Sequence, residues 1–138
     1  MTAAALITLS AAIILVLGVA HLVYTFVEIK LHPRDCALTK RMQEVSPVIS
    51  PQTTMWRAWV GFNASHSLGA MLFGATYMYL AMCHPRMLMQ SQFLLAQGLA
   101  LLTTYLWLSM RYWFRVPRLG IAISTALYAA AAVLAYAG

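Results

Sequence analysis

Two histidines, His21 and His66, lie within long apolar runs of the sequence, where polar side chains are rare. Neutral imidazole is the commonest metal ligand in proteins, and two facing histidines can also ligate a haem iron. Ionisable side chains inside a membrane are costly and therefore mark functional sites by default. We take these two residues as the first candidates for a cofactor or metal site.

Membrane helices must position the histidines, because the composition excludes an ordinary soluble fold. The 138-residue chain is 62% hydrophobic and 9% charged, with a mean hydropathy of +0.76, whereas soluble domains carry about 25% charged residues. Runs without Asp, Glu, Lys or Arg each suit a bilayer span of about 20 residues, and their backbone groups must bond within a helix. These runs are Ala3–Val27, Ala58–Met82, Leu88–Met110 and Leu119–Ala137.

We predict an all-α integral membrane protein, an up-and-down four-helix bundle that forms a single domain over residues 1–138. The spanning helices are expected at about 3–31, 55–82, 87–112 and 117–137, with a basic cytoplasmic loop over 32–54. Within the loop, Asp35 is expected to cap a short amphipathic helix over Cys36–Glu44. This segment either lies on anionic lipid headgroups or acts as a lid or partner-docking loop.

The basic residues predict the orientation in the membrane. The net charge is +6, and eight of the nine Lys and Arg residues fall in the first and third connections. The positive-inside rule then places both termini outside the cytoplasm. The expected partners are the lipid bilayer and, through faces of small residues, a second copy of the chain. No basic patch interleaved with aromatic residues indicates nucleic-acid binding.

The two histidines are predicted to lie at one depth, because each is about ten residues from the cytoplasmic end of its helix. At 1.5 Å per residue both lie about 15 Å deep, near the middle of the bilayer. The two helices run antiparallel, so side chains at three- and four-residue spacing are expected to form layers. The predicted layers are Gly18 with Gly69, His21 with His66, Tyr24 with Asn63, and Glu28 with Arg57.

Three functions remain open from the residues alone. In the first, His21 and His66 ligate a redox cofactor such as haem, or a metal ion, and the neighbouring layers line the site. In the second, Tyr24, Asn63 and His66 hold a lipid-like or quinone-like molecule in an enzyme or carrier, with Glu28 or His21 as a base. In the third, the histidines only pack, and the protein is a structural subunit without a ligand. The pattern therefore assigns no catalytic residue.

Several motifs together resemble an uncharacterised family of small four-helix bacterial inner-membrane proteins. The most specific of them is Gly61-Phe62-Asn63-x-Ser65-His66-Ser67-x-Gly69. The others are Pro33-Arg34-Asp35, Thr54-Met55-Trp56-Arg57-Ala58-Trp59, Phe73-Gly74 and Arg111-Tyr112-Trp113-Phe114. The resemblance covers nearly the whole chain and implies a bacterial inner-membrane location, but it implies no activity, ligand or site. The architecture is also similar to that of DoxX-like proteins and of the trimeric glutathione-using membrane enzymes, as an analogy.

Overall fold

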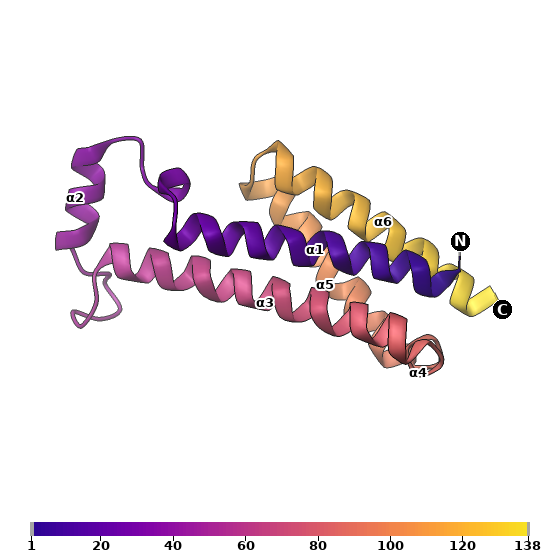
Figure 1. Ribbon diagram of the computed structural model, residues 1–138. Coiled ribbons are helices and arrows are strands. Elements are labelled where there is room, and N and C mark those ends of the chain that lie inside the picture. The colour runs from indigo at the N-terminus through magenta and orange to yellow at the C-terminus, as the bar shows by residue number, and fades with distance from the viewer. Residues whose placement is uncertain (1, 138) are drawn as a thin grey trace. The chain divides into compact units, whose positions relative to one another are not determined.

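Helices joined by turns and loops, without strands, make up the part of the chain that the computed structural model describes, residues 2–137. A single turn of 3-10 helix, Ile29–Leu31, follows the first α-helix. The α-helices, shown in Figure 1, are α1 (Ala3–Phe26), α2 (Cys36–Glu44), α3 (Met55–Cys83), α4 (Pro85–Gln90), α5 (Gln92–Tyr112) and α6 (Arg115–Ala137). The predicted all-α class is therefore confirmed.

Three of these helices are long and apolar enough to cross a membrane, judged by length and composition. They are α1, α5 and the Arg115–Tyr136 part of α6. The longest helix, α3, has 29 residues but does not belong to this set. Polar residues in its first half, among them Asn63 and His66, lower its average hydropathy. The three apolar helices are consistent with a membrane protein.

Two boundaries differ from the predicted helices. The helix expected over 3–31 ends at Phe26, and the chain is extended at Glu28, with φ −119° and ψ 160°. The helix expected over 87–112 is two helices, because α4 begins at Pro85 and α5 begins after Ser91. The Ser91 hydroxyl accepts a hydrogen bond from the backbone N–H of Leu94, at 3.2 Å, and so caps α5. The other two helices, α3 and α6, match the prediction to within two residues.

The short helix predicted in the basic loop is confirmed as α2, with the expected bounds Cys36–Glu44. Asp35 precedes it in an extended conformation, and its carboxylate accepts a hydrogen bond of 2.8 Å from the backbone N–H of Ala37. The carboxylate thereby satisfies one of the free N–H groups at the start of the helix.

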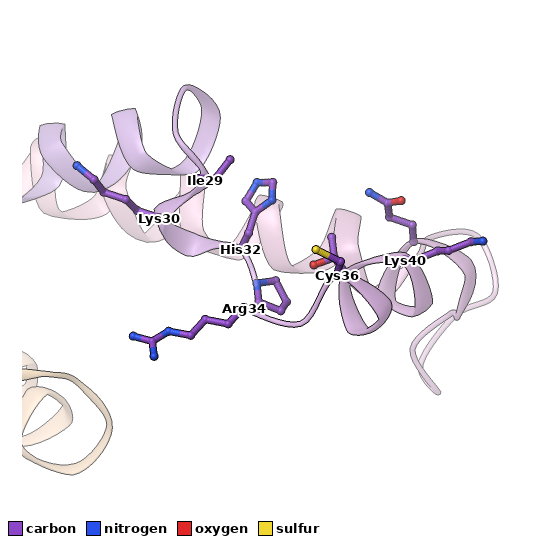
Figure 2. Close-up of a pocket in the computed structure, with 9 residues that line it drawn as sticks. Ile29, Lys30, His32, Arg34, Cys36 and Lys40 are labelled. Atoms are coloured by element: carbon purple, nitrogen blue, oxygen red, sulfur yellow. The ribbon is translucent and has the colours of Figure 1, made fainter.

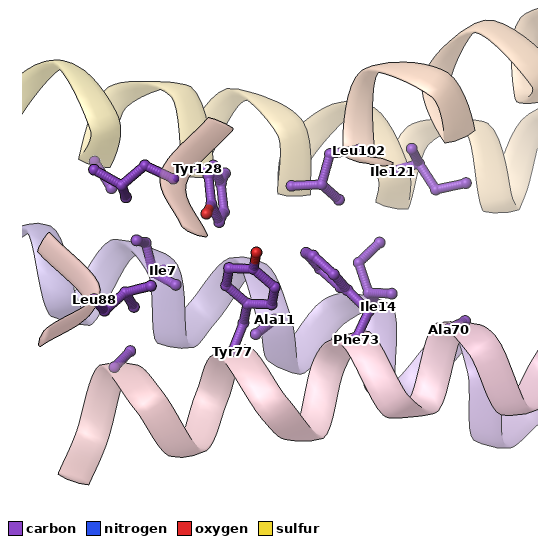
Figure 3. Packing of buried hydrophobic residues seen from close by; sticks show 13 residues of the cluster. Ile7, Ala11, Ile14, Ala70, Phe73, Tyr77, Leu88, Leu102, Ile121 and Tyr128 are labelled. Carbon is purple, nitrogen blue, oxygen red and sulfur yellow. The ribbon is translucent and has the colours of Figure 1, made fainter. Parts of the chain in front are cut away.

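Contacts divide the chain into two compact units, through both of which α1 and α3 run. The larger unit comprises Met1–Leu17 and Ala70–Gly138, and the smaller unit comprises Gly18–Gly69. The larger unit holds a hydrophobic core to which α1, α3, α5 and α6 all contribute (Figure 3). Its most enclosed large side chains are Ile7, Ile14, Leu88, Leu102 and Tyr128, each under 2% exposed or at that limit.

Buried hydroxyl groups link the helices of the larger unit. Ser10 of α1 and Ser124 of α6 each donate to the other's backbone carbonyl, at 2.8 and 3.0 Å, and their side-chain oxygens are 2.8 Å apart. Two hydroxyl protons are thus shared among four oxygen atoms. From α3 and α6, the Tyr77 and Tyr128 hydroxyls both donate to the Leu94 carbonyl of α5, at 2.7 and 3.3 Å. The two tyrosine rings point toward one another (Figure 3), with centroids 5.7 Å apart.

Two glycines allow close approach between helices in the same unit. A Cβ atom at Gly74 of α3 would lie 2.7 Å from the Leu15 Cβ and 2.8 Å from the Ala11 carbonyl oxygen of α1. A Cβ atom at Gly98 of α5 would collide with the Tyr128 phenol. The first obstacle is largely backbone and cannot rotate away, so Gly74 fixes how closely α1 and α3 pack.

We expect Gly74→Ala to lower the free energy of unfolding in detergent by about 1–3 kcal/mol, the usual cost of overpacking a core. Gly61→Ala on the same helix is the matched control, because a Cβ there would meet nothing within 4 Å. That control should be neutral or slightly stabilising, since Ala is the better helix former. Unfolding in sodium dodecyl sulfate, followed by circular dichroism, measures both. Equal effects of the two substitutions would contradict the close approach of α1 and α3 at Gly74.

Candidate functional site

Asn63 is the central polar residue of the smaller unit, because its carboxamide bonds to two different helices. Its amide nitrogen donates to the Trp59 carbonyl, one turn earlier on α3, at 2.8 Å. Its amide oxygen lies 3.0 Å from Nε2 of His21 on α1. Both groups of the short side chain are therefore engaged, and the side chain has one orientation.

This orientation determines which ring nitrogen of His21 carries a proton. A carbonyl such as that of Trp59 can only accept a hydrogen bond, so the Asn63 NH2 group must face it. The Asn63 oxygen must then face His21, whose Nε2 therefore carries the proton and donates. In the neutral ring, the remaining lone pair lies on Nδ1. If His21 ligates an ion, it does so through Nδ1.

His66 lies directly against His21, as the depth calculation predicted. Their ring centroids are 5.3 Å apart, with the planes at 83°, and both side chains are half-buried. Axial ligation of a haem would require the porphyrin to lie between the two imidazoles. Because the rings meet edge to face, the contact leaves no layer between them for a porphyrin. Neighbouring positions around one small ion suit this arrangement better.

Hydroxyl side chains support both halves of the polar centre from within their own helices. Thr25 donates to the His21 carbonyl and Ser67 donates to the Asn63 carbonyl, each at 2.8 Å and each four residues further along the helix. Such bonds bend a helix slightly and satisfy the hydroxyl locally. We did not predict these two residues, although the repeated four-residue spacing in the sequence was a usable signal.

The layers predicted on either side of the histidines differ from the prediction. Tyr24 does not pair with Asn63; its ring instead lies 4.2 Å from the Lys30 ammonium. Glu28 does not pair with Arg57; its carboxylate lies 3.0 Å from Lys30. This hydrogen bond is the main reason that the pKa of Lys30 is raised above its ordinary value. The helix break after Phe26 explains the change at Glu28, because the chain beyond the break no longer follows the helical spacing.

The two glycines that were predicted to form one layer differ in their exposure. Gly18 is buried, whereas Gly69 is exposed.

Trp59, which we did not include among the site residues, has two roles. Its carbonyl holds Asn63, and its indole N–H donates to the Leu31 carbonyl at 3.1 Å, which ties the end of the 3-10 turn to α3. The four residues that the structure brings together are thus His21, Trp59, Asn63 and His66.

Residues 2–137 contain no group of three or more His, Cys, Asp or Glu side chains arranged to hold a metal ion. An ion at the two histidines would therefore take its remaining ligands from water, from other atom types or from another molecule. Comparison with protein-family models, with curated proteins and with solved structures found no match.

We expect Asn63→Ala to lower the free energy of unfolding by about 1 kcal/mol, the usual value of a hydrogen bond between membrane helices. The neutral His21 ring should also no longer favour the Nε2–H tautomer, a change that ¹⁵N spectra of the labelled imidazole will report. Ser65→Ala is the matched control, because its exposed hydroxyl bonds only to the Phe62 carbonyl of its own helix. If Asn63→Ala matched this control in both measurements, the link between Asn63 and His21 would be refuted.

Proposed function

We propose that this chain is a multi-pass protein of the bacterial inner membrane, in which α1, α3, α5 and α6 form an up-and-down four-helix bundle. Three of the helices have the composition of spans. That α3 also spans the membrane is argued from its length, about 43 Å at 1.5 Å per residue, and from its contacts with α1. Within the larger unit Gly74 packs against α1, and within the smaller unit Asn63 bonds to His21. Asn63 of α3 therefore finds its hydrogen-bond partners inside the protein, as a polar side chain in a span requires.

The proposed orientation places both termini outside the cytoplasm, with α2 and its flanking loop inside. Two exposed cysteines provide native labels for this topology, Cys36 in the loop and Cys83 at the far end of α3. In spheroplasts, a membrane-impermeant maleimide should modify Cys83 and leave Cys36 unmodified until the membrane is broken. Single variants Cys36→Ser and Cys83→Ser assign the signal. Labelling of Cys36 in intact spheroplasts would reverse the orientation.

We propose further that the histidine pair binds a ligand, and that this ligand is a metal ion or a metal-containing redox cofactor. The observation that carries the proposal is the fixed orientation of His21, with Nε2–H on Asn63 and its ring against His66. Metal-bound histidines commonly donate their other N–H to an oxygen acceptor, which sets the ring's direction and raises its basicity. Asn63 supplies that acceptor, so its proposed role is to position His21 and not to bind the ion. The contact between the rings favours an ion over haem.

A lipid-like or quinone-like ligand is the second candidate, and a groove in the larger unit favours it. The groove has a volume of about 300 Å³ and is lined by Phe73 and Tyr77 of α3 with Gln97 and Thr104 of α5. Aromatic walls with an amide group suit a flat ring that carries carbonyl oxygens. This ligand would bind away from His21, so the two candidates are separable by mutation.

Purification in mild detergent, from cells supplied with iron, copper, zinc and haem, tests the metal proposal. We expect bound metal in a fixed ratio to protein, measured by mass spectrometry, and lost in both His21→Ala and His66→Ala. Asn63→Ala should weaken metal affinity about 10- to 100-fold, the usual effect of removing a ligand's hydrogen-bond partner.

Two other histidines serve as controls for this experiment. His32 lies in the loop beside Trp56, and His84 contacts Tyr79 at the far end of α3. His32→Ala and His84→Ala should retain the metal. The proposal would be refuted if the purified protein held no stoichiometric metal and showed no haem absorption band. Co-purified quinone or lipid that is lost in Gln97→Ala would then support the second candidate.

A further inference from the structure

The chain between α2 and α3 is a closed loop with a defined tip. At its base, the backbone N–H of Met55 donates to the Val45 carbonyl at 2.8 Å. At its far end, the backbone N–H of Ser50 donates to the Pro47 carbonyl at 3.2 Å, which closes a β-turn. The two residues between Pro47 and Ser50 form the tip, and these hydrogen bonds hold them in place.

Val48 and Ile49 are unusual residues for the tip of a turn. The central positions of a β-turn favour Gly, Asn, Asp, Pro and Ser, whereas Val and Ile are apolar and β-branched. Ile49 is 92% exposed and Val48 is fully exposed, which makes them the most exposed large hydrophobic side chains in residues 2–137. Departures from such local preferences are expected at functional sites. The tip therefore indicates an apolar partner outside the chain.

The loop lies at the end of α3 that would enter the membrane from the side of the basic segment. It projects sideways from the first turn of α3 (Figure 1). Trp56 lies in that turn, and tryptophan prefers the headgroup level of a bilayer. From this position the tip is close to the boundary between headgroups and acyl chains.

The loop carries no charge, unlike the segment before it. No Asp, Glu, Lys or Arg occurs between Glu44 and Arg57. Arg34 and Lys40, by contrast, are exposed and extend in opposite directions from the preceding segment (Figure 2). Contact of α2 with anionic headgroups would use such cations, whereas the tip can make only apolar contacts. The partner of the tip is therefore recognised by its apolar surface and not by its charge.

The small size of the tip favours the bilayer over a soluble protein as this partner. A stable protein–protein interface buries about 800 Å² on each partner, far more than two side chains can cover. Binding a soluble protein also costs translational and rotational freedom, whereas the proposed spans already hold the loop at the membrane. Two apolar side chains are enough to enter lipid from there, but they are too few to hold a soluble protein.

We propose that Val48 and Ile49 insert into the apolar boundary of the adjacent leaflet and anchor the loop beside α3. The ligand is the upper acyl chain of any membrane lipid, and a charged headgroup is not required. This proposal rests on the proposed bundle, because the tip reaches lipid only if α3 enters the membrane at its first turn. The closed turn lowers the entropy cost of insertion, since the tip already has its inserted shape.

Methyl NMR of the full-length protein in phosphatidylcholine nanodiscs tests the proposal, with ¹³C-labelled isoleucine. Lipids with a nitroxide on the acyl chain should broaden the Ile49 methyl signal, and an aqueous gadolinium chelate should leave it sharp. Ile49→Val assigns the signal. Ile123, which is 54% exposed on α6, is the internal reference for lipid contact. Addition of phosphatidylglycerol should change nothing, because the tip is uncharged.

The reference separates failure of this proposal from failure of the bundle. If the lipid nitroxide broadened Ile123 but not Ile49, only the insertion of the tip would be overturned. If it broadened neither signal, the proposed bundle would fail as well. The proposal is also overturned if broadening of Ile49 requires phosphatidylglycerol, since the basic α2 would then carry the loop to the membrane.

A double variant, Val48→Ser with Ile49→Ser, tests the anchoring role. Amide hydrogen exchange across the loop should rise about ten-fold in nanodiscs, because opening of the loop no longer withdraws two half-buried side chains from lipid. Ser favours turns, so the turn itself does not explain a loss of protection. Leu38→Ser removes an exposed apolar side chain from α2 and should leave exchange in the loop unchanged. Equal exchange in the wild type and the double variant would overturn the anchor.

Discussion

A polar side chain among apolar helices must find its hydrogen-bond partner within the protein, because lipid offers none. Most hydroxyl groups here meet this constraint on their own helix, as Thr8 does with the Ala4 carbonyl and Thr125 with that of Ile121. In residues 2–137, no buried side-chain nitrogen or oxygen lacks a partner. The few polar groups that reach another helix therefore carry unusual weight. Asn63 is the clearest of them, since it satisfies its own helix and a neighbouring one with the same carboxamide.

Simple counting along the sequence was enough to predict the main elements. The apolar runs gave the long helices, and the Asp35 cap gave α2 with its bounds. The depth calculation brought His21 and His66 together because both lie inside regular helices, where position follows directly from residue number. The Lys and Arg residues between the first two apolar runs likewise identified the basic loop.

The parts that the sequence did not predict lie where the helical spacing stops. Glu28 was assigned to the same helix as His21, but the helix ends at Phe26, and Glu28 turns to Lys30 in the following segment. The break at Ser91 was not predicted because the run Leu88–Met110 contains no charged residue, although the polar residues Gln90, Ser91 and Gln92 stand together at the break. The residue pattern also does not reveal which residue of α1 bonds to Asn63. The Trp59 carbonyl fixes the orientation of the Asn63 carboxamide, and this contact cannot be read from the sequence.

The shared Leu94 carbonyl has a mechanical consequence for the larger unit. Tyr77 from α3 and Tyr128 from α6 both end on this single oxygen of α5. A slide of either helix along α5 by one turn, about 5.4 Å, would carry its hydroxyl out of reach and leave it unpaired in apolar surroundings. Gly98 provides the recess in α5 that admits the Tyr128 ring. The three helices are thereby locked in axial register, and any sliding motion of one must carry the other two with it.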